Sequence, residues 1–167
     1  MERKTIKRIL DFFVTKEGKK LPRKWFRSMP IHELINYLET YPDDEACEYN
    51  GDLDLSRTNI IKLPKVLYVN GFLYLGESST IKLPNELYVF GELNLILCEK
   101  IRELPNTLYV RDNLMLIHSN VKELPEVLKV GGNLHIYNTP LAEKYTDDEI
   151  IEMITSKGGK LSGKIYR

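Results

Sequence analysis

Hydrophobic and polar residues alternate in a block that recurs along most of the chain. In one copy of this block, Leu67, Val69, Leu73 and Leu75 occupy every second position around Gly71. That is the period of a β-strand, whose side chains point alternately to its two faces. Successive copies, 20 or 21 residues apart, begin at Gly51, Gly71, Gly91, Asp112 and Gly132. Such a fixed period indicates a solenoid, in which each repeat gains a core only by stacking on its neighbours.

The alternation extends beyond these five copies. Cys47 and Tyr49 align with Leu67 and Val69, so the first rung is expected to begin four residues before Gly51. The same spacing returns near the end of the chain at Leu161, Gly163 and Ile165. Glycine at the central inward position predicts a bend between two short strands, because glycine tolerates dihedrals and close approaches that other residues do not.

Each of the first four blocks contains a Leu-Pro pair, which predicts a turn or an extended segment. Proline has no amide donor, so this side of a rung is not expected to form a continuous central sheet. The pairs are Leu63-Pro64, Leu83-Pro84, Leu104-Pro105 and Leu124-Pro125. The aliphatic residue before the pair is displaced at Ile81 and Ile101, which predicts local distortion over residues 77–80 and 97–100.

Helical periodicity replaces the strand pattern at both ends. Residues 2–14 form an amphipathic stripe, and a second helix is expected to start near Pro30 and close at Tyr41-Pro42. The buried side of that second helix is predicted to comprise Ile31, Leu34, Ile35 and Leu38. Near the other end, Thr146 and Glu149 make a capping box, and Gly158-Gly159 is expected to stop the helix. Its predicted buried face comprises Ile150, Ile151, Met153 and Ile154.

The predicted fold is therefore α+β: a parallel β-solenoid of about five 20-residue rungs between helical caps. Residues 1–167 are expected to form one domain, with a helical N-terminal cap over 1–46, repeats over 47–141 and a helix-strand cap over 142–167. Such caps would cover the apolar core and the unpaired strand edges that the end rungs otherwise expose.

Charge and cysteine content say more about where the protein is located than about what it does. Lys plus Arg and Asp plus Glu both number 24, so no overall charge points to nucleic acid or an anionic membrane. Charged residues interrupt the N-terminal apolar run, and no stretch reaches the roughly 18 apolar residues of a membrane span. Cys47 and Cys98 fall at repeat positions, which predicts buried, reduced thiols and a cytoplasmic protein.

The repeated row, L-x-V-x-G-x-L-x-L-x-x-[ST]-x-I-x-x-L-P, resembles leucine-rich repeats over residues 47–141. It is similar in particular to the short Leu-Pro repeats of bacterial and bacteriophage proteins. The resemblance implies a protein-binding module, encoded by a bacterium or phage, that binds and modulates a host protein in the host cytoplasm. The usual asparagine ladder is replaced by Thr58, Ser78, Cys98, Ser119 and Thr139. This replacement, and the glycine between Val69 and Leu73, are departures from the family pattern. The curvature is therefore left open between a horseshoe and a straighter solenoid.

Groups suited to catalysis are sparse. Cys98, His118 and His135 fall in neighbouring rungs, but Cys98 belongs to the inward column of small residues, and no triad or ligand spacing joins the three. The consecutive Asp43, Asp44 and Glu45 are interpreted as a solvated loop. The chain is therefore predicted not to be an enzyme, with no catalytic residues, metal site or cofactor.

The outward columns are the predicted partner-binding residues, because they vary from row to row while the inward columns do not. One group centres on the Leu-x-Leu strands: Phe72, Tyr74, Asn94, Met115 and His135. The other follows the preceding strand: Tyr68, Tyr88, Phe90, Tyr109 and Arg111. Aromatic neighbours on one face can stabilise a sheet, and exposed Tyr, Phe and Arg can form binding hot spots, so both interpretations are retained. The partner is expected to be another protein, of unknown identity.

The alternative is a nucleic-acid-associated protein that uses its basic N-terminal segment. Basic side chains surround Trp25 and Phe26. The basic side chains could hold phosphate, and the two aromatic rings could stack on a nucleobase. These basic residues are Lys19, Lys20, Arg23, Lys24 and Arg27. The neutral net charge favours instead a solvated helix face, with the aromatic residues plugging the first rung.

Overall fold

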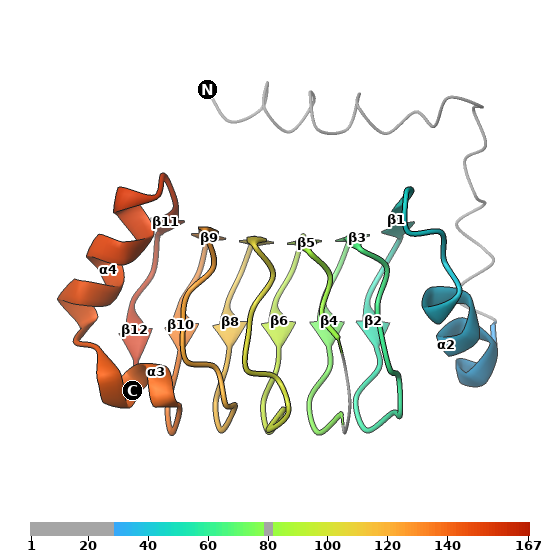
Figure 1. Cartoon of the computed structure of the whole chain (residues 1–167), viewed down its shortest axis with the longest axis horizontal. Coiled ribbons are helices and arrows are strands. Elements are labelled where there is room, and N and C mark those ends of the chain that lie inside the picture. The colour runs from blue at the N-terminus through green and yellow to red at the C-terminus, as the bar shows by residue number, and fades with distance from the viewer. Residues whose placement is uncertain (1–28, 79–81) are drawn as a thin grey trace. The chain divides into compact units, whose positions relative to one another are not determined.

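The computed structural model describes residues 29–78 and 82–167, which form a parallel β-solenoid (Figure 1). The chain divides into two units, residues 1–30 and 31–167, and the solenoid belongs to the second. The predicted helix over 2–14 and the basic segment around Trp25 lie outside the described residues.

Two six-stranded parallel sheets make up the solenoid. Sheet A contains the longer strands β1 (Ala46–Tyr49), β3 (Val66–Val69), β5 (Glu86–Val89), β7 (Thr107–Val110), β9 (Val127–Val130) and β11 (Lys160–Leu161). Sheet B contains β2 (Leu53–Asp54), β4 (Leu73–Tyr74), β6 (Leu93–Asn94), β8 (Leu114–Met115), β10 (Leu134–His135) and β12 (Ile165–Tyr166). In Figure 1, the strands of sheet B face the viewer and those of sheet A are seen nearly end-on above them. The chain passes from sheet A to sheet B at the bend that contains the repeated glycine, as the sequence predicts.

Strand register confirms both extensions of the repeat. Cys47 pairs with Leu67 in β1 and β3, so the first rung does begin before Gly51. At the other end, Leu161 pairs with Val130, and Ile165 pairs with Leu134. The final strands therefore continue both sheets after the C-terminal helix.

The core lies between the two sheets and is filled by the inward column of every rung. Leu67, Val69, Leu73 and Leu75 are all fully buried, and their counterparts in the neighbouring rungs are buried as well. Each such side chain contributes about 1.5–3 kcal/mol of burial before the entropy of ordering is subtracted. Because every leucine packs against the rungs before and after it, stability is shared along the stack.

A left-handed residue recurs after every strand of sheet B from β2 to β10. These residues have φ between 52° and 59° and comprise Arg57, Glu77, Leu97, His118 and Asn138. The next residue turns inward, where Thr58 and Ser78 both donate hydroxyl hydrogen bonds to the Leu55 carbonyl. Leu97 is therefore a regular part of its rung. The predicted distortion follows it, where the Ile101 amide donates to the Cys98 carbonyl in an extra turn; residues 79–81 lie outside the described range.

The Leu-Pro side of the rungs is extended, as predicted, and among the described residues its strand pairing is limited to one bridge between Lys62 and Lys82. The sequence did not indicate where the prolines point. All four are buried, whereas three of the four preceding leucines are only half-buried. Proline suits this inward position because it fills core volume without bringing an amide that would need a buried partner.

Three described helices flank the rungs: α2 (Ile31–Glu39), α3 (Pro140–Lys144) and α4 (Asp147–Ser156). In α2, Leu34 and Leu38 are buried, but Ile31 is exposed, contrary to prediction, because it lies in the first position of the helix. In α4, the predicted burial of Ile151 is also wrong. Ile150 and Ile154 share the packed face four residues apart, and Ile151 lies about 100° around the helix from Ile150.

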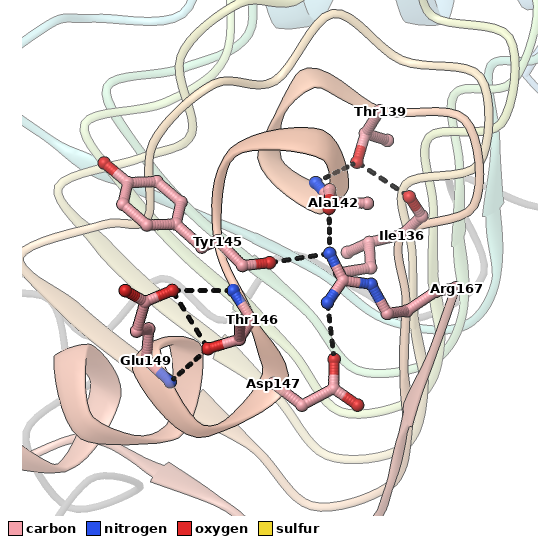
Figure 2. A network of polar contacts seen from close by, with 8 residues as sticks. All are labelled: Ile136, Thr139, Ala142, Tyr145, Thr146, Asp147, Glu149 and Arg167. Carbon is pink, nitrogen blue, oxygen red and sulfur yellow. Dashed lines mark hydrogen bonds and ion pairs between the residues drawn. The ribbon is translucent and has the colours of Figure 1, made fainter.

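Hydrogen bonds fix the C-terminal cap (Figure 2). Thr146 and Glu149 form the predicted capping box, in which the Glu149 amide donates to the Thr146 hydroxyl and the Thr146 amide donates to the Glu149 carboxylate. The guanidinium of Arg167 lies against the same junction. It donates to the carbonyls of Ala142 and Tyr145 and pairs with Asp147 at 3.1 Å.

Candidate functional site

The ten predicted partner-binding residues lie on two different faces of the solenoid. Sheet B carries Phe72, Tyr74, Asn94, Met115 and His135. Sheet A and the positions just after its strands carry Tyr68, Tyr88, Phe90, Tyr109 and Arg111. The bend in each rung separates the two groups, so they form two candidate surfaces and not one site (Figure 1).

The face of sheet B is acidic at its first rung and aromatic at its second. Asp52 and Asp54 are exposed beside β2, and the rings of Phe72 and Tyr74 follow on the next rung, 6.0 Å apart. Phe72 keeps 37% of its surface exposed. Partial burial raises the pKa of the Tyr74 hydroxyl, and the nearby carboxylates of Glu92, Asp52 and Asp54 raise it further. This tyrosine is therefore a neutral hydrogen-bonding group at any physiological pH.

Two further aromatic residues extend this face towards the C-terminal cap. Tyr166 stacks on His135 with ring centroids 4.7 Å apart, and Tyr137 meets His118 edge-on at 5.8 Å. Both tyrosines are about half exposed, at 46% and 51%. The sequence prediction missed them because Tyr166 belongs to the closing rung and Tyr137 follows its strand by two residues. Tyr166 could have been found from the sequence, because it continues the outward column of His135 from β10 to β12.

Several polar side chains along the edge of sheet B serve the fold. The Asp52 carboxylate accepts a hydrogen bond from the Phe72 amide, and the Asn113 side chain accepts one from the Asn133 amide. The Asn133 side chain in turn accepts one from the backbone amide of Lys164. Each links its rung to the next at the bend, so these side chains are held in place.

The face of sheet A carries an aromatic cluster over its middle rungs. The Tyr68 and Tyr88 rings stack in parallel, with centroids 4.5 Å apart and an angle of 5° between them. The Tyr88 hydroxyl donates to Glu86 at 3.0 Å, and Phe90 packs against Tyr109 at 5.7 Å. Partial burial raises the pKa of both stacked tyrosines. The stacking interpretation of this column therefore has direct support between Tyr68 and Tyr88.

Charged residues flank that cluster. Glu48 lies exposed on the first strand of sheet A and accepts a hydrogen bond from Asn70 at 2.6 Å. Lys129 and Lys160 lie exposed on the last two strands of the sheet, and Arg111 is exposed just after β7. One end of this face is thus acidic, its middle aromatic and its other end basic.

The structure does not bring the three sequence candidates for catalysis together. Cys98 is buried, and its thiol donates to the Leu75 carbonyl at 3.0 Å. His118 lies on an exposed turn with its Nδ1 atom 3.3 Å from Asn138, and His135 stacks on Tyr166. Burial raises the pKa of the Cys98 thiol to about 11, which opposes formation of the thiolate that a nucleophile requires.

The acidic run after α2 lies at the surface, as predicted. Asp43 pairs with Lys65 at 3.1 Å and lies 3.9 Å from Lys62. Asp44 and Glu45 are exposed. Within residues 29–78 and 82–167, no group of three or more His, Cys, Asp or Glu side chains is placed to hold a metal ion.

The described helices are too short or too polar to cross a membrane. No protein-family model matches the chain, and no significant match is found among curated proteins or solved structures.

Proposed function

We propose that this chain is a non-enzymatic protein-binding module of the leucine-rich-repeat type, with about five 20-residue rungs. In this proposal it is a bacterial or bacteriophage protein that binds and modulates a host protein in the cytoplasm. The observation that carries the proposal is the contrast within sheet B. Its inward positions are leucine or isoleucine in every strand, whereas its outward positions change from rung to rung and expose large apolar side chains.

The repeat type is supported by the small residue that follows each Leu-x-Leu strand. In leucine-rich repeats an asparagine at this position bonds to the backbone of neighbouring rungs. Here Ser78 donates to the Leu55 carbonyl one rung earlier, and the Cys98 thiol donates in the same way to Leu75. Two smaller side chains of this column thus make bonds of the same kind between rungs, while Thr58 and Thr139 bond to carbonyls of their own rungs. Sheet B then corresponds to the strand face on which this family commonly binds its partners.

The chemistry of the face indicates what a partner would present. Phe72 and Tyr74 offer partly exposed rings, which are the residue type enriched in binding hot spots. Asp52 and Asp54 lie at the acidic end of the same face. A complementary protein surface would place an apolar group over the two rings and a Lys or Arg side chain near the two carboxylates.

Affinity capture with two matched double variants tests this proposal. The full chain is used as bait in an extract of the host, and retained proteins are quantified by mass spectrometry. Phe72→Ser with Tyr74→Ser removes two rings from sheet B, and Tyr88→Ser with Phe90→Ser removes two from the sheet A side. We expect the sheet B variant to lose a specific protein, by tenfold or more for a hot-spot pair, and the sheet A variant to retain it.

Circular dichroism of both variants should match that of the parent chain, because none of the four side chains is fully buried. A loss of binding is then due to the missing rings and not to unfolding. Retention of every captured protein by the sheet B variant would exclude that face. Loss of the partner only in the sheet A variant would move the binding site to the other sheet.

A further inference from the structure

The middle outward column of sheet A changes character in one direction along the solenoid. From the first strand to the last, it reads Glu48, Tyr68, Tyr88, Tyr109, Lys129 and Lys160. Lys129 and Lys160 are direct neighbours across β9 and β11. Like charges placed opposite each other on adjacent strands destabilise a sheet unless something compensates them. Among the described residues, no acidic side chain pairs with either lysine or with Arg111.

We propose that this face binds a second copy of the chain, with the two copies related by a twofold axis that reverses the order of the rungs. The reversed column is complementary to the original at every position. Glu48 of one copy then faces Lys160 of the other, Tyr68 faces Lys129, and Tyr88 faces Tyr109. A twofold axis makes each of these contacts occur twice, which is the usual arrangement of homodimers.

Each contact in this arrangement is chemically favourable. The first joins a carboxylate to an ammonium group, and it also neutralises one of the two adjacent lysines. The second places an ammonium group by a tyrosine ring, as in cation–π pairs. The third brings together two aromatic side chains, which are already half-buried in the single chain and so lose little further freedom.

Glu48 and Lys160 cannot make this pair within one chain. They occupy the first and last strands of a six-stranded sheet, so five strand spacings separate them. At about 4.8 Å per spacing the separation is roughly 24 Å, far beyond the reach of two side chains. Any energetic coupling between these two residues must therefore pass between two molecules.

Sheet B lacks this self-complementarity. Its corresponding column reads Asp54, Tyr74, Asn94, Met115, His135 and Tyr166. Reversing the order places Asp54 against Tyr166 and Asn94 against Met115, with no pair of opposite charges. The inference therefore applies to sheet A alone and is independent of the proposed binding function of sheet B.

The size of the face predicts a weak dimer. Six strands at about 4.8 Å spacing, with four to five residues at about 3.3 Å each, cover roughly 400 Å². Two copies would bury about 800 Å², which falls in the range of weak and transient interfaces. We expect a dissociation constant between about 1 µM and 1 mM, rising with salt because both ends of the interface are charged.

A charge swap measured by sedimentation velocity tests the proposal. The full chain is examined from about 1 µM to about 1 mM, a range that spans the expected constant. Glu48→Lys creates two contacts between lysines, and Lys160→Glu creates two contacts between glutamates. Each change should weaken dimerisation about tenfold, given the modest energy of exposed ion pairs and the twofold repetition. The double variant reverses both charges and should recover most of the affinity.

Two controls separate charge pairing from other effects. Glu48→Gln keeps an acceptor for Asn70 while removing the charge, so its effect should be smaller than that of Glu48→Lys. Lys164→Glu changes an exposed lysine beside β12 of sheet B and should leave the dissociation constant unchanged.

Three results would overturn the inference. One is a monomer at every concentration, and another is a dimer indifferent to both single reversals. The third is a double variant as weak as either single one, which would show that the two residues do not face each other.

Discussion

The direction in which a side chain points decides whether it packs in the core of this fold or lies at its surface. Asn94 and Leu95 are consecutive, yet Leu95 is fully buried while Asn94 lies at the surface of sheet B. Cysteine follows the same rule. Cys47 and Cys98 replace inward residues of other rungs, and both are almost completely buried. Their chemistry is therefore set by burial and not by a functional neighbour.

The two thiols are predicted to be unreactive in the folded protein. Burial raises the pKa of Cys47 to about 12 and that of Cys98 to about 11, so almost no thiolate exists at neutral pH. Titration with a thiol reagent at neutral pH should label both cysteines only after unfolding. Rapid labelling of Cys98 in the native chain would contradict its inward position and would show that its thiol can act as a nucleophile.

Alkaline pH should destabilise the fold through the same two groups. Their folded-state pKa values lie above the ordinary value of 9, so the folded chain holds these protons more tightly than the unfolded chain. The stabilising contribution is complete below pH 9 and is lost as the pH rises towards 11 and 12. Substitution of both cysteines by alanine should reduce the slope of unfolding free energy in this window.

At the scale of elements, the C-terminal cap shows how a repeat is ended. Thr139 occupies the small inward column of the last regular rung, where its hydroxyl donates to the Ile136 carbonyl. The same hydroxyl accepts from the Ala142 amide and caps α3 (Figure 2). One residue thus completes the repeat and starts a helix, after which α4 packs against β9 and β11.

Removing the cap of α4 should weaken the end of the solenoid. Thr146→Ala deletes the hydroxyl that accepts from the Glu149 amide and should cost about 1 kcal/mol of unfolding free energy. Thr155→Ala is the matched control, because its hydroxyl bonds only to helix carbonyls near the other end. Denaturant unfolding of both variants measures the difference, and equal losses would show that the capping box does not stabilise the fold.

At the scale of the whole molecule, most of the rung geometry could be predicted from spacing alone. The inward alternation around Gly71 located the paired strands, and the isolated echo at Leu161 and Ile165 located the last ones. Period-2 spacing is a strong signal because a shift of one residue would turn every leucine to solvent.

Other features could not be predicted because the same residue types serve two purposes. Leu141 fits the aliphatic position of a rung, so α3 was not expected, although Pro140 is favourable at a helix start. The inward direction of the prolines depends on packing between rungs. The separation of the candidate surfaces onto two sheets follows from the bend, whose angle a linear pattern does not contain.

Inward columns hold the solenoid together, whereas outward columns vary from rung to rung. Equilibrium unfolding of Leu95→Asp and Asn94→Asp tests this difference at two adjacent positions in a middle rung. The aspartate at 94 can still accept from the Ile96 amide, as Asp54 accepts from Ser56 in the first rung. We predict a change within about 0.5 kcal/mol for Asn94→Asp and a loss above about 4 kcal/mol for Leu95→Asp. Similar stabilities for the two variants would contradict the inward register on which the two-faced solenoid rests.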